Sequence, residues 1–382
     1  MTTTNKTKIK KVILHIGSEK TGSTSIQMLL RKSQKLLLSN GILYPSTLSH
    51  DLHHAIFCSC FTAEADLLQY NLGRDRIQVL LERDKGYLCA FEKLLLETHA
   101  HTVILSYEGF WRLTEDSLNE VRAFLENYCD EIKIVFYARP PLAYAKSAMS
   151  QRVKMGRRVG ENDDLFFVNY QDILDKFGQV FGKSQIDVRL FSKETLPAGN
   201  VVLDFLSLLN LPKRTAEKVI RKGRNRNASL SQEAWAIGDR IAELLDGYVP
   251  PNEFNNKRAF GLLFLPAIKG QKFQLTDSQQ KTILELTEPQ TEYLAREFGI
   301  NIQERLHTGH KPLRISKDTV DYTARALLRL LVPEFNPPTE TPAPNGCNLD
   351  RCFIIKVMLK TKVLVIALPA YRRLRSVQRR FN

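Results

Sequence analysis

The sequence predicts an α/β fold in which helices cover both faces of a central parallel sheet in three layers, with helical additions towards the C-terminus. Two observations lead to this prediction. Short apolar runs alternate with amphipathic segments up to about residue 199, and the pattern after that residue is almost wholly helical. Strand–helix alternation is typical of parallel sheets with helices on both faces. The chain has 382 residues, of which 43% are hydrophobic, so a sizeable core is available.

Four apolar runs are predicted as strands because each is short and ends at turn-forming or polar residues. They cover residues 12–16, 102–106, 132–137 and 186–191. Amphipathic spacing predicts the helices. These cover residues 22–38, 116–128, 142–153, 167–181, 201–209, 231–245, 277–298 and 317–331.

Composition divides the chain into four parts. A basic arm over residues 1–10 precedes one α/β domain over residues 11–335. Residues 336–350 contain four prolines and are predicted to be a linker. The tail over residues 351–382 is apolar but interrupted by lysines and arginines. It predicts a basic amphipathic helix on a membrane surface, or else a helix that packs back on the domain or binds a partner.

Positive charge is concentrated in two segments of the chain. Lys and Arg number 55 against 41 Asp and Glu, which gives a net charge of +14. Residues 337–382 hold nine basic and two acidic residues, and residues 213–226 hold seven basic and one acidic. This excess predicts an anionic partner. A nucleic-acid binder usually spreads its basic residues along one face, so we expect a nucleotide, glycan or lipid surface instead.

The six cysteines do not have the spacing of a metal site. None occurs as C-x2-C, and no histidine spacing completes a zinc site. We therefore expect no metal, and reduced thiols in a cytoplasmic protein. The apolar run at residues 12–16 is too short for the core of a signal peptide. No uncharged apolar stretch reaches the length of a membrane span.

A turn of small residues follows the first predicted strand and opens a predicted helix. Its sequence is GSEKTGST over residues 17–24. A helix N-terminus offers backbone N–H groups and the positive end of the helix dipole. Both favour a phosphate or sulfate group, and Lys20 adds a cation. A plain strand–helix turn capped by a hydroxyl group is the alternative.

The same turn also has part of the ATPase pattern G-x-x-x-x-G-K-[ST]. Gly17 and Gly22 have the required separation, but Ser23 stands at the position of the lysine. No predicted strand ends in an obvious acidic pair for Mg²⁺. A magnesium-dependent P-loop kinase or ATPase is therefore the runner-up hypothesis.

A second basic site is predicted at the end of the third strand. Arg139 follows this strand, and Pro140 and Pro141 suit the first turn of the next helix. Open α/β sheets bind ligands at the carboxyl ends of their strands, so Arg139 should lie on the same edge as Lys20. Arginine holds phosphate through two parallel hydrogen bonds.

Together, the two motifs resemble those of sulfotransferases that use 3′-phosphoadenosine-5′-phosphosulfate (PAPS), in particular bacterial members of the carbohydrate type. The stretch KTGST is similar to the loop that binds the 5′-phosphosulfate, and Ser147 stands eight residues after Arg139, as the family pattern requires. The resemblance covers residues 11–300 and implies a P-loop nucleotide-binding-like fold. It also implies a metal-free reaction with these co-substrate ligands: Lys20, Thr21, Gly22, Ser23, Thr24, Arg139 and Ser147.

A third match to the family is the basic segment Arg221-Lys222-Gly223. Family members carry a Lys-Gly loop that closes over the nucleotide, and its positive charge suits a 3′-phosphate. A solvated basic loop with no ligand is the alternative.

The acceptor hydroxyl needs a general base. Glu108 follows the second predicted strand and should therefore lie at the same edge of the sheet as Lys20 and Arg139. His53 and His54 are the competing candidates, because relatives use either His or Glu. A structural hydrogen bond or ion pair is the alternative for each of the three.

The resemblance implies that a sulfuryl group moves from PAPS to a hydroxyl acceptor. A carbohydrate or glycan is the favoured acceptor class, with a small metabolite or lipid as alternatives. A non-catalytic basic protein that binds a membrane surface or a glycan is the third hypothesis. We expect a cytoplasmic location, with peripheral contact at the inner face of the membrane under the membrane interpretation of the tail.

Overall fold

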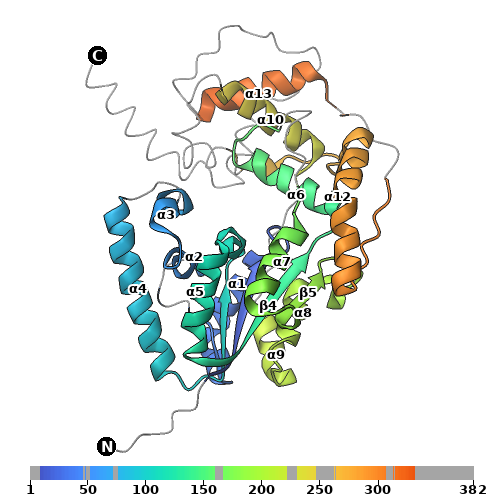
Figure 1. The fold of residues 1–382 in the computed structure, drawn as a ribbon. Coiled ribbons are helices and arrows are strands. Elements are labelled where there is room, and N and C mark those ends of the chain that lie inside the picture. The colour runs from blue at the N-terminus through green and yellow to red at the C-terminus, as the bar shows by residue number, and fades with distance from the viewer. Residues whose placement is uncertain are drawn as a thin grey trace, which may run out of the picture. The chain divides into compact units, whose positions relative to one another are not determined.

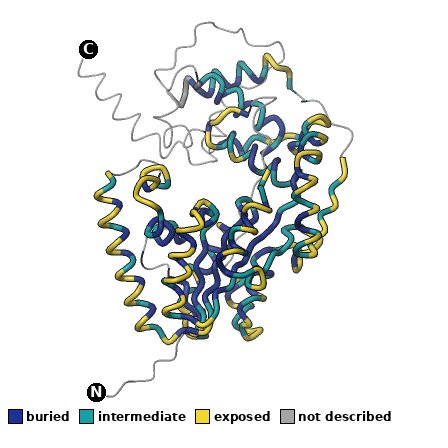
Figure 2. Tube along the Cα trace, in the orientation of Figure 1, coloured by how far each residue is buried: buried dark blue, intermediate teal, exposed yellow. Residues whose placement is uncertain are grey.

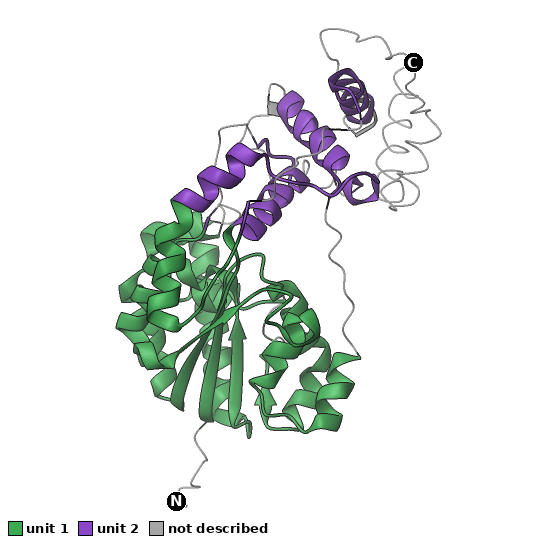
Figure 3. Cartoon of the chain, turned by 90° about the vertical axis from the view of Figure 1, so that its right-hand side faces the viewer, with its two compact units in different colours: residues 1–141, 168–226, 286–304 green, residues 142–167, 227–285, 305–382 purple. Residues whose placement is uncertain are grey.

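The computed structural model describes residues 9–45, 48, 52–71, 76–159, 167–221, 230–246, 262, 264–306, 313 and 315–331. The chain forms two compact units, which Figure 3 shows in green and purple. Unit 1 consists of Met1–Pro141, Val168–Arg226 and Leu286–Glu304, and unit 2 of Leu142–Phe167, Asn227–Glu285 and Arg305–Asn382. The sequence patterns gave no sign of this division within residues 11–335. The predicted linker and tail, residues 336–350 and 351–382, lie outside the described residues.

Unit 1 contains a five-stranded sheet in the order β2-β3-β1-β4-β5. Figure 1 shows the strands of this sheet among the helices of the unit. Each neighbouring pair is parallel. The strands are β1 (Ile9–Gly17), β2 (Ile42–Leu43), β3 (Thr102–Ser106), β4 (Cys129–Ala138) and β5 (Ile186–Leu190). The predicted α/β class with a central parallel sheet is confirmed. Every predicted strand is present, and β2 is a short edge strand that the patterns missed.

The helices of unit 1 lie on both faces of this sheet. They are α1 (Ser23–Leu38), α2 (Ala55–Ser59), α3 (Glu64–Tyr70), α4 (Ile77–Glu97), α5 (Glu115–Glu126), α7 (Tyr170–Phe181), α8 (Val201–Ser207) and α9 (Lys213–Ile220). Short 3₁₀ helices are η1 (Glu108–Arg112), η2 (Lys183–Gln185) and η3 (Pro197–Gly199). All but the first residue of α6 (Pro141–Lys154) belongs to unit 2, and the residues of α12 (Asp277–Phe298) are divided between the units after Glu285.

Side-chain alternation along β1 divides the core of unit 1 into two layers. Val12, Leu14 and Ile16 join one apolar cluster with α2, α4, α5 and α7. Ile13 joins the other cluster with α1, α8 and α9. Successive residues of a strand point to opposite faces, so one strand supplies both layers. Figure 2 shows the resulting buried strands at the centre of this unit.

Unit 2 is helical, as the sequence predicts for the region after residue 199. It contains α10 (Gln232–Asp246), η5 (Leu265–Ala267) and α13 (Lys317–Leu331), together with parts of α6 and α12. Arg240 on α10 pairs with Asp321 on α13, with Nη2 to Oδ1 at 2.6 Å. Among the described residues, no helix combines the length and the apolar character that a membrane crossing needs.

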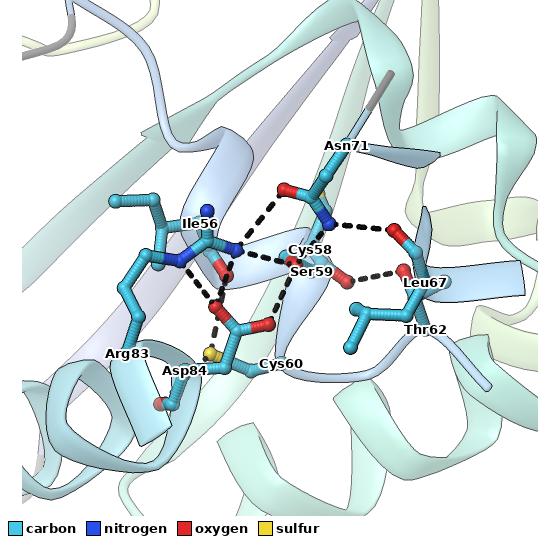
Figure 4. A network of polar contacts seen from close by, with 9 residues as sticks. All are labelled: Ile56, Cys58, Ser59, Cys60, Thr62, Leu67, Asn71, Arg83 and Asp84. Atoms are coloured by element: carbon cyan, nitrogen blue, oxygen red, sulfur yellow. Dashed lines mark hydrogen bonds and ion pairs between the residues drawn. The ribbon is translucent and has the colours of Figure 1, made fainter. Parts of the chain in front are cut away.

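The segment between β2 and β3, to which the patterns assigned no element, forms α2, α3 and α4. A polar network ties these helices together (Figure 4). Ser59 Oγ donates to Asp84 Oδ2 at 2.6 Å, and Arg83 Nε donates to Asp84 Oδ1 at 2.7 Å. Arg83 Nη2 also donates to Asn71 Oδ1 at 3.0 Å. Because Asp84 is buried on α4, these bonds supply the partners that its carboxylate needs away from water.

Candidate functional site

The turn after β1 is tied to the neighbouring strand β4. Both the backbone N–H and the hydroxyl of Ser18 donate to the carbonyl oxygen of Tyr137, at 3.1 and 2.8 Å. Within the turn, Thr21 Oγ1 donates to the carbonyl oxygen of Ser18 at 2.5 Å. Ser18, Thr21 and Ser23 are all buried. Their hydroxyls therefore fix the shape of the turn from inside.

Gly22 is the residue before α1 and has a left-handed backbone, with φ of 81° and ψ of 15°. Glycine adopts this conformation without steric cost. A Cβ at this position would also meet Val201 Cγ1 at 2.7 Å. No side chain caps α1. Within the described part of the chain, the N–H groups of residues 21–24 donate to no protein acceptor. The helix therefore presents unused donors at its N-terminus.

The close packing of Val201 against Gly22 depends on the position of α8. Asp204 on this helix accepts from the Tyr137 hydroxyl at 2.7 Å and from Arg189 Nη1 at 2.8 Å. Burial, with a smaller contribution from Asp204, raises the pKa of Tyr137 well above its usual range. Tyr137 therefore stays protonated and donates, and the three side chains hold α8 against β4 and β5.

Lys20 lies in the middle of the turn with φ of 64°, an uncommon backbone for a residue with a side chain. Burial lowers the pKa of Lys20, Glu19 and Glu108 raise it, and Arg139 lowers it further. Among the described residues, its ammonium group makes no hydrogen bond or ion pair. A half-buried cation without a close counter-ion favours an anionic ligand.

Arg139 follows β4 directly, and its guanidinium lies beside the turn. Arg139 Nη1 donates to the carbonyl oxygen of Lys20. The same guanidinium lies 5.2 Å from the centre of the Phe191 ring. Tyr170 holds the backbone, because its hydroxyl donates to the carbonyl oxygen of Arg139 at 2.5 Å and accepts from its N–H at 3.2 Å. Lys20 and Arg139 thus meet where the connections from β1 and β4 diverge, the usual ligand position in such sheets.

Glu108 begins η1, immediately beyond β3, and lies on the other side of the turn. Its Cβ is 3.5 Å from the position that a Cβ on Gly17 would occupy. Gln27 Nε2 on α1 donates to Glu108 Oε2 at 3.4 Å and to Ser106 Oγ at 3.2 Å. The predicted meeting of Glu108, Lys20 and Arg139 at one edge of the sheet therefore agrees with the geometry.

The contacts of His54 are those of a side chain that stabilises the fold. Its Nδ1 accepts from the backbone N–H of Ser106 at 2.9 Å, and the ring packs edge-on against Tyr44 at 4.8 Å. Burial lowers the pKa of His54 to about 3. A buried neutral ring whose Nδ1 is occupied has no lone pair available for an acceptor hydroxyl. His53 is half-buried and packs against Tyr107, with ring centres 4.8 Å apart. This geometry favours Glu108 over His54 as the base.

The remaining predicted site residues are Ser147 and the segment 221–223. Ser147 lies half-buried on α6 in unit 2. Arg221 is the exposed residue at the end of α9 in unit 1, and Lys222 and Gly223 lie outside the described residues. Sequence patterns did not identify Gln27, Tyr170 or Phe191, because their contacts to the site arise only from the fold.

The comparisons with known proteins leave the family open. No family model matches the chain. A protein of Archaeoglobus fulgidus described as uncharacterized is 31% identical over 147 residues, which are 38% of this chain and 39% of that protein. The match thus spans well under half of the relative. In the described ranges, no three His, Cys, Asp or Glu side chains are grouped as metal ligands.

Proposed function

We propose that the protein is a sulfotransferase that moves a sulfuryl group from PAPS to a hydroxyl acceptor. One observation carries the proposal: the uncapped N-terminus of α1, the half-buried Lys20 and the guanidinium of Arg139 converge between the ends of β1 and β4. Free donors and cations at one place suit a ligand with separate anionic groups. The nucleotide PAPS carries a phosphosulfate and a 3′-phosphate.

In this proposal, the backbone N–H groups of residues 21–24 hold the 5′-phosphate, and Lys20 stabilises the charge that develops on the leaving oxygen. Arg139 binds the 3′-phosphate in this proposal. Glu108 lies beside Gly17, its Cβ 3.5 Å from the place that a Cβ on Gly17 would take, and this supports a role for the carboxylate next to the transferred group. Positioning and charge stabilisation are the main demands of such a transfer.

The proposed reaction is an in-line displacement at sulfur. Glu108 takes the proton of the acceptor hydroxyl, and the acceptor oxygen forms a bond to sulfur. The bond between sulfur and the bridging oxygen breaks, and 3′-phosphoadenosine-5′-phosphate (PAP) leaves with that oxygen. The charge of Glu108 raises the pKa of Lys20, and in the proposed reaction both side chains act at the transferred group.

A carbohydrate is the acceptor class that we propose. Tyr107 and Trp111 flank Glu108 in the sequence and are half-buried, and Arg112 lies over the Trp111 ring at 5.4 Å. Aromatic faces can pack against the apolar face of a sugar. Arg112 is paired with Glu19, with Nη2 to Oε1 at 3.6 Å, so an acidic group on the sugar would compete with Glu19 for this guanidinium. We also propose a cytoplasmic location, where PAPS would be available to the protein.

Calorimetry with PAP tests the nucleotide site. We expect micromolar binding that persists in EDTA, a loss of at least about tenfold in Lys20→Ala, and a larger loss in Arg139→Ala. Arg122→Ala is the matched control, because Arg122 pairs with Glu126 on α5 and should leave binding unchanged. Absence of binding to the wild type at high micromolar PAP would contradict the proposal. Turnover of Mg²⁺-ATP would instead favour a kinase or ATPase.

Incubation with sulfur-labelled PAPS and fractionated host extract tests the acceptor. We expect label in a glycan fraction with the wild type and none with Glu108→Gln, which should still bind PAP. Label in a lipid or small-metabolite fraction would overturn the choice of carbohydrate.

A further inference from the structure

A chain of buried polar side chains leads from the centre of the sheet to Glu108. His15 on β1, Ser106 at the end of β3 and Gln27 on α1 are each at most 2% exposed. His15 Nδ1 lies 2.7 Å from Ser106 Oγ. The Gln27 amide nitrogen lies 3.2 Å from Ser106 Oγ and 3.4 Å from Glu108 Oε2. Side chains from three different elements therefore form one chain of contacts, and Gln27 is the member that reaches the carboxylate.

The directions of these bonds follow from the chemistry of the groups. Glu108 as a carboxylate only accepts, so the Gln27 amide must present its NH₂ to it and to Ser106. The Ser106 hydroxyl accepts from Gln27 and has its own proton left for His15 Nδ1. Burial lowers the pKa of His15 to about 4, although Glu108 raises it slightly. His15 is therefore neutral near pH 7 and can accept.

The bond between His15 and Ser106 also indicates which way the Gln27 amide faces. If the amide were turned over, its oxygen would lie against the Glu108 carboxylate, and two acceptors would oppose each other there. The Ser106 hydroxyl, bonded to His15, favours the amide nitrogen on its side. The ring of His15 is itself held, edge-on to Tyr137 at 5.8 Å and against Phe205 at 5.3 Å.

We propose that Gln27 is a positioning residue that holds Oε2 of Glu108 and leaves Oε1 as the atom that accepts the proton. This inference rests on the proposed function. Among the described residues, the Gln27 amide bonds to Ser106 and Glu108 and to neither Lys20 nor Arg139, so its effect is confined to the base. A misplaced reacting group lowers rate much more than affinity.

The variants Gln27→Met and Gln27→Glu test this role. Met keeps the length of the side chain without the N–H donors, and Glu places a second carboxylate next to Glu108. We expect turnover of PAPS, measured as label released to acceptor or water, to fall about 100-fold in Gln27→Met and further in Gln27→Glu. The KM for PAPS and the Kd for PAP should stay within about threefold. Gln69→Met, at an exposed position on α3, should leave the turnover, the KM for PAPS and the Kd for PAP unchanged.

A second measurement does not depend on turnover or on a stable Gln27 variant. In the full-length wild type, the Gln27 NH₂ signals in an NMR spectrum should be protected from exchange with water. They should shift and lose protection in Glu108→Ala. Unchanged signals, or Gln27→Met with wild-type turnover, would overturn the inference and leave the proposed function standing. A wild type that fails to bind PAP would overturn both.

Discussion

Two polar clusters in unit 1 differ in how far the protein satisfies its own charges. In the network of α2, α3 and α4, the Asp84 carboxylate pairs with Arg83 and accepts from Ser59 (Figure 4). In the turn after β1, Lys20 has no close counter-ion among the described residues, and α1 has no side-chain cap. The Asp84 carboxylate of the first cluster is paired within the protein. The second cluster presents backbone N–H donors and the Lys20 ammonium group to a ligand.

This difference indicates that the first cluster stabilises the fold and that the second binds a ligand. A buried polar group that meets its partners within the protein stabilises the fold, and one that lacks them lowers stability. Lys20 also has a left-handed backbone that glycine would adopt more easily. Such features are found at functional sites, where a ligand supplies the missing partners. Substitutions in the two clusters should therefore have opposite signatures.

The largest effect is expected for Lys20→Ala. Loss of the cation should reduce sulfuryl transfer by about 10³-fold, because the leaving oxygen loses its main counter-charge. The free energy of unfolding should stay the same or rise, since a partly desolvated ammonium is removed. Turnover with labelled PAPS and urea unfolding measure the two quantities. Wild-type transfer, or a clear loss of stability, would place Lys20 with the structural cluster.

The next effect is a loss of stability in acid. Burial lowers the pKa of His15 to about 4 and that of His54 to about 3, from an ordinary value of 6.5. Between those values the unfolded chain binds more protons than the folded one, so stability falls as the pH falls. From pH 7 to pH 5, each histidine should lower the free energy of unfolding by about 2 kcal/mol.

The variant His54→Gln separates this effect from general acid denaturation. Between pH 7 and pH 5, the free energy of unfolding of this variant should fall by about 2 kcal/mol less than that of the wild type, whatever its stability at pH 7. His99→Gln at an exposed position is the control and should keep the wild-type slope. An unchanged slope in His54→Gln would show that this ring does not need to stay neutral for the fold.

Asp84→Asn should have the signature opposite to that of Lys20→Ala. It removes the charge that pairs with Arg83 and accepts from the Ser59 hydroxyl. The free energy of unfolding should fall by about 2 kcal/mol, a modest loss because Arg83 is partly solvated. Affinity for PAP should not change. Glu97→Gln, in the exposed pair with Lys93, should alter stability by less than about 0.5 kcal/mol. Weakened PAP binding in Asp84→Asn would mean that the two clusters are coupled.

The sequence predicted that the turn after β1 and Arg139 lie at the same edge of the sheet, because parallel strands bring their carboxyl ends to one edge. It could not predict Gln27, whose position on α1 matters only once β3 places Ser106 and Glu108 beside it. The helix α4 was missed for a related reason. Arg83 and Asp84 look like solvated charges in the sequence, and only the packing of α2 and α3 buries Asp84 and gives it Ser59 as a second partner.

The smallest expected effect compares two glycines that both have a positive φ. Gly22 has φ of 81° and Gly299 has φ of 68°, but a Cβ would meet Val201 at 2.7 Å in the first case and nothing within 4 Å in the second. Each substitution to Ala should lower the free energy of unfolding by about 1 kcal/mol, the cost of a left-handed backbone. Only Gly22→Ala should also push α8 away from the turn, and weaken PAP binding by about tenfold. Equal PAP affinities in the two variants would show that α8 does not set the shape of the binding turn.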